Sequence, residues 1–199
     1  DLRDRALRLL LAAAEDEQDI VAANAIEALA QVAPKEGAPA IREAVNSPSM
    51  IKRFAAFVAL GEMRDRAAIE QIRTAVRRER GRVRLAAIFA AYRCGEQGHI
   101  SDLLGVLTSD PDENSRADAA FLLGRLNERQ ALERMRLMAS REKSRKVLTQ
   151  LFVAMAELGD TTALDRLIQL TQGEVVSRTV ALQGLVELRD PRAKDAFEV

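Results

Sequence analysis

The sequence repeats itself every 30 to 32 residues. Six segments of 14 residues can be superimposed on one another along the chain. They are Asp19–Val32, Met50–Met63, Gly81–Cys94, Glu113–Leu126, Arg145–Leu158 and Val175–Leu188. A fixed period of this size is typical of a solenoid, in which each unit buries its apolar face only against its neighbours. The period therefore predicts the fold class before any other feature of the chain is considered.

Each unit is predicted to contain two helices joined by a short polar turn. The first helices should begin near Arg5, Glu36, Arg66, Gly98, Glu128, Thr161 and Arg192. Their apolar residues recur at intervals of three and four, as Leu164, Leu167 and Ile168 do. The second helices are the six superimposed segments. Acidic residues recur where the next first helix begins, which is the end of a helix that favours negative charge. These residues are Asp65, Glu96, Glu128, Asp160 and Asp190.

Two columns of residues run through the second helices. The first column is almost entirely alanine and is predicted to be buried: Ala25, Ala56, Ala87, Ala119, Leu151 and Ala181. The other lies five residues later and consists mostly of small residues: Ala30, Gly61, Tyr92, Gly124, Ala156 and Val186. Small side chains allow helix backbones to approach closely. We therefore expect the small column to face the first helix of its own unit.

These features predict an all-α fold, a right-handed α-solenoid that forms one array over residues 1–199. The repeats are expected at about 1–33, 34–64, 65–95, 96–127, 128–159 and 160–189, with a partial repeat at 190–199. The chain begins at a repeat boundary and stops inside a unit. We therefore expect it to be an excerpt of a longer protein.

Charge and composition limit the possible functions. Acidic and basic residues balance at 30 each, so the formal net charge is zero. A chain without a net positive field is not expected to bind nucleic acid non-specifically. Arginine outnumbers lysine and alanine is abundant, which is a bacterial-type composition. No run of 18 apolar residues predicts a membrane span. No signal peptide is visible, so the cytoplasm is the default location, and the truncated N-terminus leaves export open.

Three stretches of the second helices resemble the HEAT repeat, and in particular its short phycobilisome-lyase-like subclass. They are Arg84-Leu85-Ala86-Ala87, then Arg53-Phe54-Ala55-Ala56 with Ala59-Leu60-Gly61, and Arg116-Ala117-Asp118-Ala119 with Leu122-Leu123-Gly124. The unit is shorter than the roughly 40–47 residues of ordinary HEAT units. The resemblance covers essentially the whole chain. It implies a stacked array of helix pairs that binds proteins.

No pattern in the sequence indicates catalysis. Cys94 is the only cysteine and lies in an apolar column, so we expect a buried structural thiol. His99 is the only histidine, which excludes a site built from several histidines and predicts a surface or capping position. No carboxylate pair, glycine-rich phosphate loop or catalytic triad stands out. We therefore predict no catalytic residue, no metal site and no cofactor.

Arginines form the most concentrated charge in the chain. Arg53, Arg84, Arg116 and Arg178 occupy one column, and the resemblance implies that they bond within and between repeats. A separate cluster places five arginines between Arg77 and Arg84, on the turn of the third repeat. This cluster has two possible interpretations. It is either a solvated turn or a contact for phosphate or an acidic peptide.

A helical wheel predicts a binding surface on the second helices. The column two residues after the buried alanines points away from the core and reads Glu27, Val58, Phe89, Phe121, Val153 and Gln183. Second helices line the concave side of HEAT-like solenoids. Val58, Phe89, Phe121 and Val153 are therefore expected to form an exposed apolar stripe there, flanked by Arg82, Arg93, Arg125, Asp118 and Glu157. The alternative is that curvature closes neighbouring helices over these side chains, which makes them core.

The sequence favours a non-enzymatic protein- or peptide-binding scaffold, in which a helix or an extended segment docks along the stripe. Two other functions stay open. One is a phycobilin-lyase-like, chromophore-associated role, which the resemblance suggests. The other is binding of nucleic acid or phosphate through Arg77–Arg84, which the zero net charge disfavours for nucleic acid. The identity of the partner and the oligomeric state are not predicted.

Overall fold

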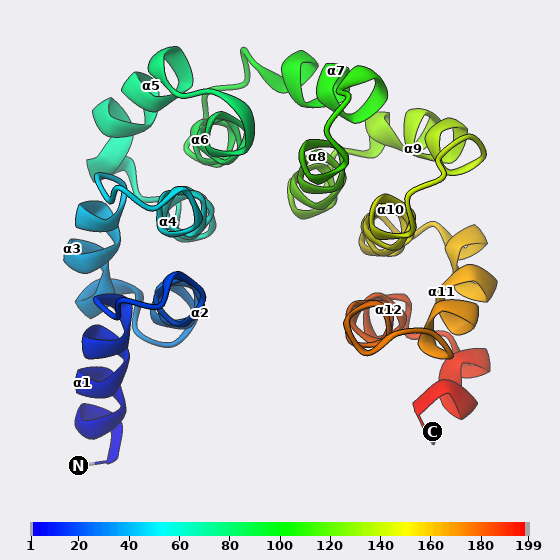
Figure 1. The fold of residues 1–199 in the computed structure, drawn as a ribbon, viewed down its shortest axis with the longest axis horizontal. Helices are drawn as coiled ribbons and strands as arrows, with labels where there is room; N and C mark the ends of the chain where they lie inside the picture. The colour runs from blue at the N-terminus through cyan, green and yellow to red at the C-terminus, as the bar shows by residue number, and fades with distance from the viewer. Residues whose placement is uncertain (1, 198–199) are drawn as a thin grey trace. The chain divides into compact units, whose positions relative to one another are not determined.

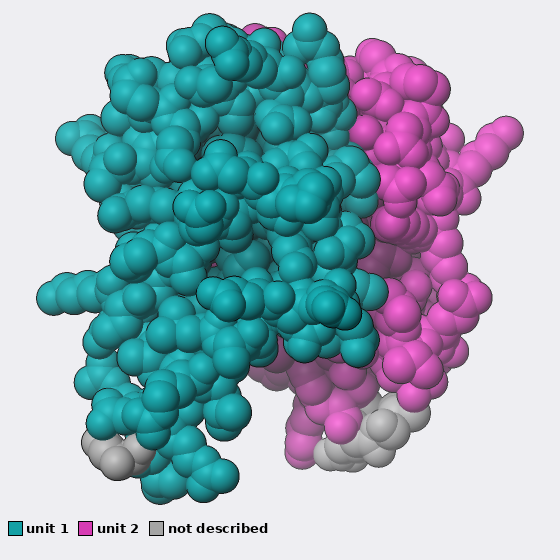
Figure 2. Space-filling model, turned by 60° about the vertical axis from the view of Figure 1, so that its left-hand side comes forward, with its two compact units in different colours: residues 1–100 teal, residues 101–199 magenta. Residues whose placement is uncertain are grey.

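The computed structural model describes residues 2–197. Within them it contains twelve α-helices, four short 3₁₀ helices and no strand. The chain is an all-α solenoid built from stacked pairs of helices. It divides into two compact units, residues 1–100 and 101–199, which are coloured separately in Figure 2. The boundary lies near the predicted junction of the third and fourth repeats.

Unit 1 consists of two layers of helices (Figure 1). The first-helix layer contains α1 (Leu2–Ala14), α3 (Pro34–Ala44) and α5 (Ile69–Arg78), with the 3₁₀ helix η1 (Arg66–Ala68) before α5. The second-helix layer contains α2 (Asp19–Val32), α4 (Met50–Met63) and α6 (Gly81–Arg93). Helix α4 packs against both α2 and α6, so it is the middle member of its layer. We call the side of this layer that faces away from the first helices the second-helix face of unit 1.

Unit 2 repeats this arrangement (Figure 1). Its first helices are α7 (Ile100–Ser109), α9 (Leu132–Ala139) and α11 (Leu164–Thr171), and the 3₁₀ helices η2 (Arg129–Ala131) and η3 (Thr161–Ala163) precede α9 and α11. Its second helices are α8 (Glu113–Arg125), α10 (Arg145–Glu157) and α12 (Val175–Leu188), and the chain continues into η4 (Pro191–Phe197). Helix α10 packs against both α8 and α12.

The predicted helices are confirmed. The six superimposed segments coincide with α2, α4, α6, α8, α10 and α12 to within one residue. The first helices, counted with the 3₁₀ helices that precede three of them, begin within three residues of their predicted starts. Local capping explains why the second helices start where they do. The side chains of Ser49, Asp112 and Ser144 accept hydrogen bonds from backbone N–H groups in the first turns of α4, α8 and α10.

Five of the six second helices end in the same backbone conformation. A residue in the left-handed conformation comes directly after the superimposed segment and reverses the chain. These residues are Arg64, Gly95, Asn127, Gly159 and Arg189. Acid caps of the next first helix follow, as predicted: Asp65, Glu128 and Asp160 accept from the backbone N–H two residues on. The period of the sequence is therefore also a period of backbone conformation.

We expected the small column of the second helices to face the first helix of its own unit, but the structure places it against the second helix of the next repeat. A Cβ atom placed on Gly61 of α4 lies 2.6 Å from the ring of Phe89, on the second helix of the next repeat. A Cβ atom on Gly124 of α8 lies 2.8 Å from Cα of Ala154 in α10. The prediction was wrong because these glycines set the spacing between consecutive second helices, where backbone and ring approach most closely.

Ion pairs connect three of the first helices to the acidic residue at the start of the following one. Arg42 of α3 contacts Asp65 at 2.7 Å, and Arg136 of α9 contacts Asp160 at 2.8 Å. Arg73 of α5 makes the equivalent pair with Glu96. Burial acts to raise the pKa of Asp160, but hydrogen bonds from Arg136 and Thr162 outweigh it, and the pKa lies below its ordinary value. Each of these carboxylates therefore links two repeats.

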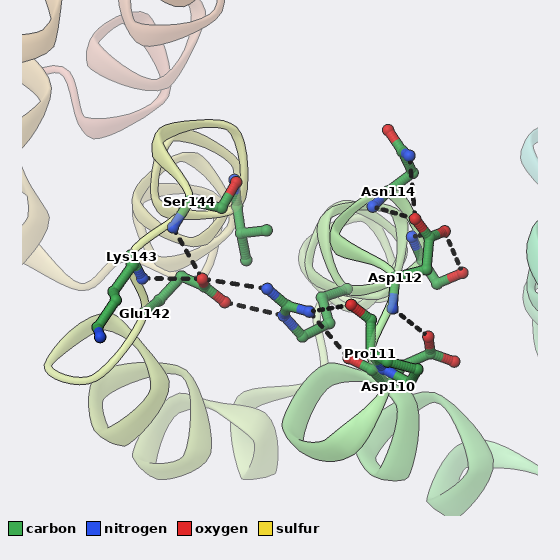
Figure 3. Close-up of polar contacts among 10 residues, drawn as sticks. Asp110, Pro111, Asp112, Asn114, Glu142, Lys143 and Ser144 are labelled. Carbon is green, nitrogen blue, oxygen red and sulfur yellow. Dashed lines mark hydrogen bonds and ion pairs between the residues drawn. The ribbon is translucent and has the colours of Figure 1, made fainter.

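The arginine column bonds within and between repeats, as the resemblance implied. Arg116 donates to the carbonyls of Asp110 and Pro111 in its own repeat and makes a two-pronged contact with Glu142 in the next (Figure 3). The Arg116–Glu142 pair is 2.8 Å long and mostly buried. Arg53 repeats the pattern in unit 1, with two carbonyls of its own turn and Glu79. These arginines are structural cross-links.

Candidate functional site

The predicted apolar stripe is not exposed. Phe89 has 0% of its surface exposed, and Val58 and Val153 are also buried. Phe121 alone is half-buried. The expectation that these four side chains form an accessible stripe is therefore wrong for three of them. Val58 and Phe89 belong to unit 1, whereas Phe121 and Val153 belong to unit 2.

Close packing of consecutive second helices explains this burial. The ring of Phe89 covers Gly61 of α4, and Cγ2 of Val153 lies 3.0 Å from a Cβ atom placed on Gly184 of α12. A helical wheel locates a side chain relative to its own first helix. It does not say how closely the adjacent repeat approaches. The alternative interpretation from the sequence, that neighbouring helices close over these side chains, is the one that the structure supports.

The charged residues expected to flank the stripe have separate roles. The guanidinium of Arg82 lies 5.4 Å from the centroid of the Phe54 ring, a cation–π contact between α6 and α4. Arg93 donates to Glu62 at 3.4 Å, also between α6 and α4. In unit 2, Arg125 is exposed and Asp118 is half-buried. The structure therefore brings Arg82 and Arg93 to the second-helix face of unit 1.

Exposed apolar side chains gather elsewhere, at the start of the second helices in unit 1. Ile20 of α2 is 66% exposed, and Met50 and Ile51 of α4 are 47% and 40% exposed. Phe54 follows one turn after Met50 and is half-buried. All four lie on second helices. They form an apolar region one to two turns nearer the N-termini of these helices than the predicted stripe.

A groove runs through this region. It is lined by Ala23 and Glu27 of α2, by Met50, Ile51, Phe54 and Ala55 of α4, and by Arg82 of α6. No first-helix residue contributes, so the groove opens on the second-helix face. Its volume is about 100 Å³. This is smaller than the roughly 300–1,000 Å³ of small-molecule sites, so the groove suits a single protruding side chain better than a cofactor. We call it the unit 1 groove.

The sequence contained a signal for this groove that the helical wheel missed. The position five residues before the buried alanines reads Ile20, Ile51, Arg82, Asn114, Lys146 and Val176. It is polar in the three middle repeats and apolar in the first two and the last. The position two residues before the alanines reads Ala23, Phe54, Leu85, Ala117, Thr149 and Thr179. Phe54 is the only aromatic residue in that column, and it forms the wall of the groove.

Only some arginines of the third-repeat cluster, Arg77–Arg84, contact other side chains or carbonyls of the repeats. Arg84 donates to the carbonyl of Val76 at 3.0 Å, and Arg82 covers Phe54. Arg77, Arg78 and Arg80 are exposed. They make no ion pair within residues 2–197. The cluster therefore presents positive charge from the last turn of α5 to the first turn of α6, and one of its members, Arg82, lines the unit 1 groove.

Neither Cys94 nor His99 forms part of a functional site. Cys94 is buried as predicted, and burial raises the pKa of its thiol. His99 is exposed. No group of three or more histidine, cysteine or acidic side chains among residues 2–197 is arranged to hold a metal ion. No helix in that part of the chain is both long and apolar enough to cross a membrane.

Comparison with protein families agrees with the helix-pair architecture. A family model of HEAT repeats matches residues 7–92 and 100–186, which together cover most of the chain. The chain belongs to the HEAT-repeat family. The two matched segments fall one in each compact unit, so both units are HEAT-repeat stacks. HEAT repeats generally serve as protein-interaction scaffolds. No curated protein matches the chain.

Proposed function

We propose that this HEAT-repeat chain is a non-enzymatic protein-binding module, and that its partner inserts an apolar side chain into the unit 1 groove. One observation supports this above the others. The exposed side chains of Met50 and Ile51 adjoin the half-buried Phe54 and an arginine, while Val58 and Phe89 on the same face are buried. The accessible apolar surface is therefore concentrated at one place on that face.

The residues of the groove have the chemistry of an interface centre. Met, Phe and Arg are enriched at the centres of protein interfaces. The flexible thioether side chain of Met50 can adapt to the shape of an inserted group. Burying one large apolar side chain of the partner contributes about 1.5–3 kcal/mol. Arg82 already covers one face of Phe54, so it provides a charged rim beside the apolar floor.

The more specific family assignment is also a proposal. The period of about 31 residues supports the short phycobilisome-lyase-like subclass over ordinary HEAT units. Only membership of that subclass suggests a chromophore-associated role, and no residue of the groove does. Such a role predicts visible absorbance of the purified protein or saturable binding of a bilin. Protein binding is the proposal that the residues of the groove support.

Selection of peptides from a displayed random library tests the protein-binding proposal. Peptides that bind the purified chain should share one large apolar residue. Ile51→Asp should weaken their binding by at least about tenfold, because a carboxylate in the groove must be desolvated when the anchor enters. Val32→Asp is the matched control, since Val32 is an exposed apolar residue outside the groove. Binders that tolerate Ile51→Asp as well as they tolerate Val32→Asp would show that the groove is not the site.

A further inference from the structure

The three turns that lead into the second helices of unit 1 differ in charge. Residues 15–19, at the start of α2, contain four acids and no base. The turn before α4 leads into the unit 1 groove at Met50 and Ile51. Residues 77–84, from the end of α5 to the first turn of α6, contain five arginines and one acid. The same edge of three consecutive repeats is therefore acidic, apolar and basic, in that order.

Much of this charge is not neutralised inside the unit. Five of these side chains are exposed and form no ion pair within residues 2–197: Glu15, Glu17, Arg77, Arg78 and Arg80. The acid of the basic turn is already used, because Glu79 pairs with Arg53 at 3.3 Å. Lys52 lies between the acidic turn and the groove and donates to the carbonyl of Asp16. The edge therefore carries exposed negative charge on one side of the groove and exposed positive charge on the other, so a partner can dock in only one orientation.

An acidic–apolar–basic order is complementary to itself under a two-fold rotation. A two-fold axis that runs alongside α4, between the two copies, brings the acidic turn of each copy against the basic turn of the other and brings the two grooves close to each other. Helix α4 lies between α2 and α6, so the acidic turn at the start of α2 and the basic turn at the start of α6 lie on either side of it (Figure 1). Met50, the exposed first residue of α4, lies nearest this axis and can pack against the groove of the opposite copy.

We infer that the partner of the unit 1 groove is a second copy of this chain, docked about a two-fold axis that runs alongside α4 between the two copies. The inference rests on the proposed function, because it uses the same groove. The formal net charge of zero means that no overall repulsion opposes association of two copies. The contact is limited to one edge of three repeats. It therefore forms a dimer weaker than an obligate one, and one that salt weakens further.

Charge reversal at the two ends of the edge tests this inference by sedimentation at low ionic strength over a range of concentrations. The wild-type chain should show a monomer–dimer equilibrium. Arg80→Glu places a carboxylate against Glu17 of the other copy, and Glu17→Arg places a guanidinium against Arg80 of the other copy. Because like charges then meet at both contacts, each variant alone should dimerise at least about tenfold more weakly. An equimolar mixture of the two variants restores an attractive contact, because the two new side chains have opposite charges and face each other. The mixture should therefore dimerise more tightly than either variant alone.

A control pair carries the same charge changes at exposed residues that do not belong to the edge. Arg134→Glu and Glu187→Arg should each leave dimerisation unchanged, alone and mixed. Ile51→Asp should abolish the dimer. A monomer at every concentration overturns the inference, and if selected peptides still require Ile51, the proposed function survives with a different partner. A dimer that ignores both Arg80→Glu and Ile51→Asp is built elsewhere, which also overturns the inference.

Discussion

At the residue scale, two glycines control how consecutive second helices pack. Gly61 leaves room for the ring of Phe89, and Gly124 leaves room for the backbone at Ala154. Phe89 is consequently part of the core, and its truncation should destabilise unit 1 as core truncations do, rather than leave stability unchanged. The same contact decides which apolar residues remain available to a partner. Those at the start of α4, beyond the reach of the neighbouring helix, stay exposed.

Gly61→Ala tests this packing. The new methyl group would lie 2.6 Å from Cε1 of Phe89 and 3.0 Å from Cα of Ala90, and neither a buried ring nor a helix backbone can move away cheaply. We expect unit 1 to lose about 1–3 kcal/mol of unfolding free energy by overpacking. Denaturant unfolding measures the change.

Gly105→Ala is the matched control for that substitution. Gly105 lies inside α7 and has no atom within 4 Å of the added methyl group. Replacing an unconstrained helical glycine by alanine should stabilise by about 0.5–1 kcal/mol. A Gly61→Ala variant that is stabilised like Gly105→Ala would show that the α4–α6 contact is looser than the structure indicates.

At the element scale, the helices could be predicted closely and the surface could not. The second helices follow from the period, because the caps Ser49, Asp112 and Ser144 and the left-handed residues after the helices recur with it. The stripe was misplaced because exposure depends on the distance between repeats, and a helical wheel contains no such information. Arg42, Arg73 and Arg136 were missed for a similar reason. Their partners lie 23 or 24 residues away and are brought close only by stacking.

The cross-link between Arg116 and Glu142 should make unit 2 sensitive to acid. Hydrogen bonds from Arg116, and from the backbone N–H groups of Ser144 and Lys143, hold the pKa of Glu142 below its ordinary value despite burial. A carboxylate whose pKa is lower in the folded state stabilises the fold at neutral pH, and this contribution is lost as pH falls through that lowered pKa. We therefore expect unit 2 to lose stability progressively as the pH falls below about 5, the upper end of the range in which a free glutamate titrates.

Glu142→Gln isolates this contribution. It should cost about 1–3 kcal/mol at pH 7, because hydrogen bonds to a charged group are lost, and it should flatten the fall in stability toward low pH. Glu133→Gln is the control, since the Glu133 side chain is 84% exposed and pairs with Arg136 only at the surface. Urea unfolding at a series of pH values gives both profiles. An unchanged acid profile in Glu142→Gln would assign the acid sensitivity to other carboxylates.

At the scale of the whole molecule, the chain contains two HEAT-repeat stacks of three repeats each. The division at residue 100 comes from the contacts within each unit, and the family matches to residues 7–92 and 100–186 fall on either side of it. A helix pair cannot bury its apolar face alone, and about three stacked repeats are needed for stability. Each unit meets this requirement with a middle second helix, α4 or α10, that is covered by neighbours on both sides.

Each unit should therefore fold on its own. We expect fragments 1–100 and 101–199 to be helical by circular dichroism and to unfold cooperatively in denaturant. A fragment of residues 1–64 is the matched comparison, because it keeps α4 but removes Phe89 from Gly61 and leaves the middle helix uncovered on one side. It should be markedly less stable than residues 1–100. If residues 1–64 were as stable as residues 1–100, or if either three-repeat fragment were unfolded, stacking of a third repeat would not be what stabilises each unit.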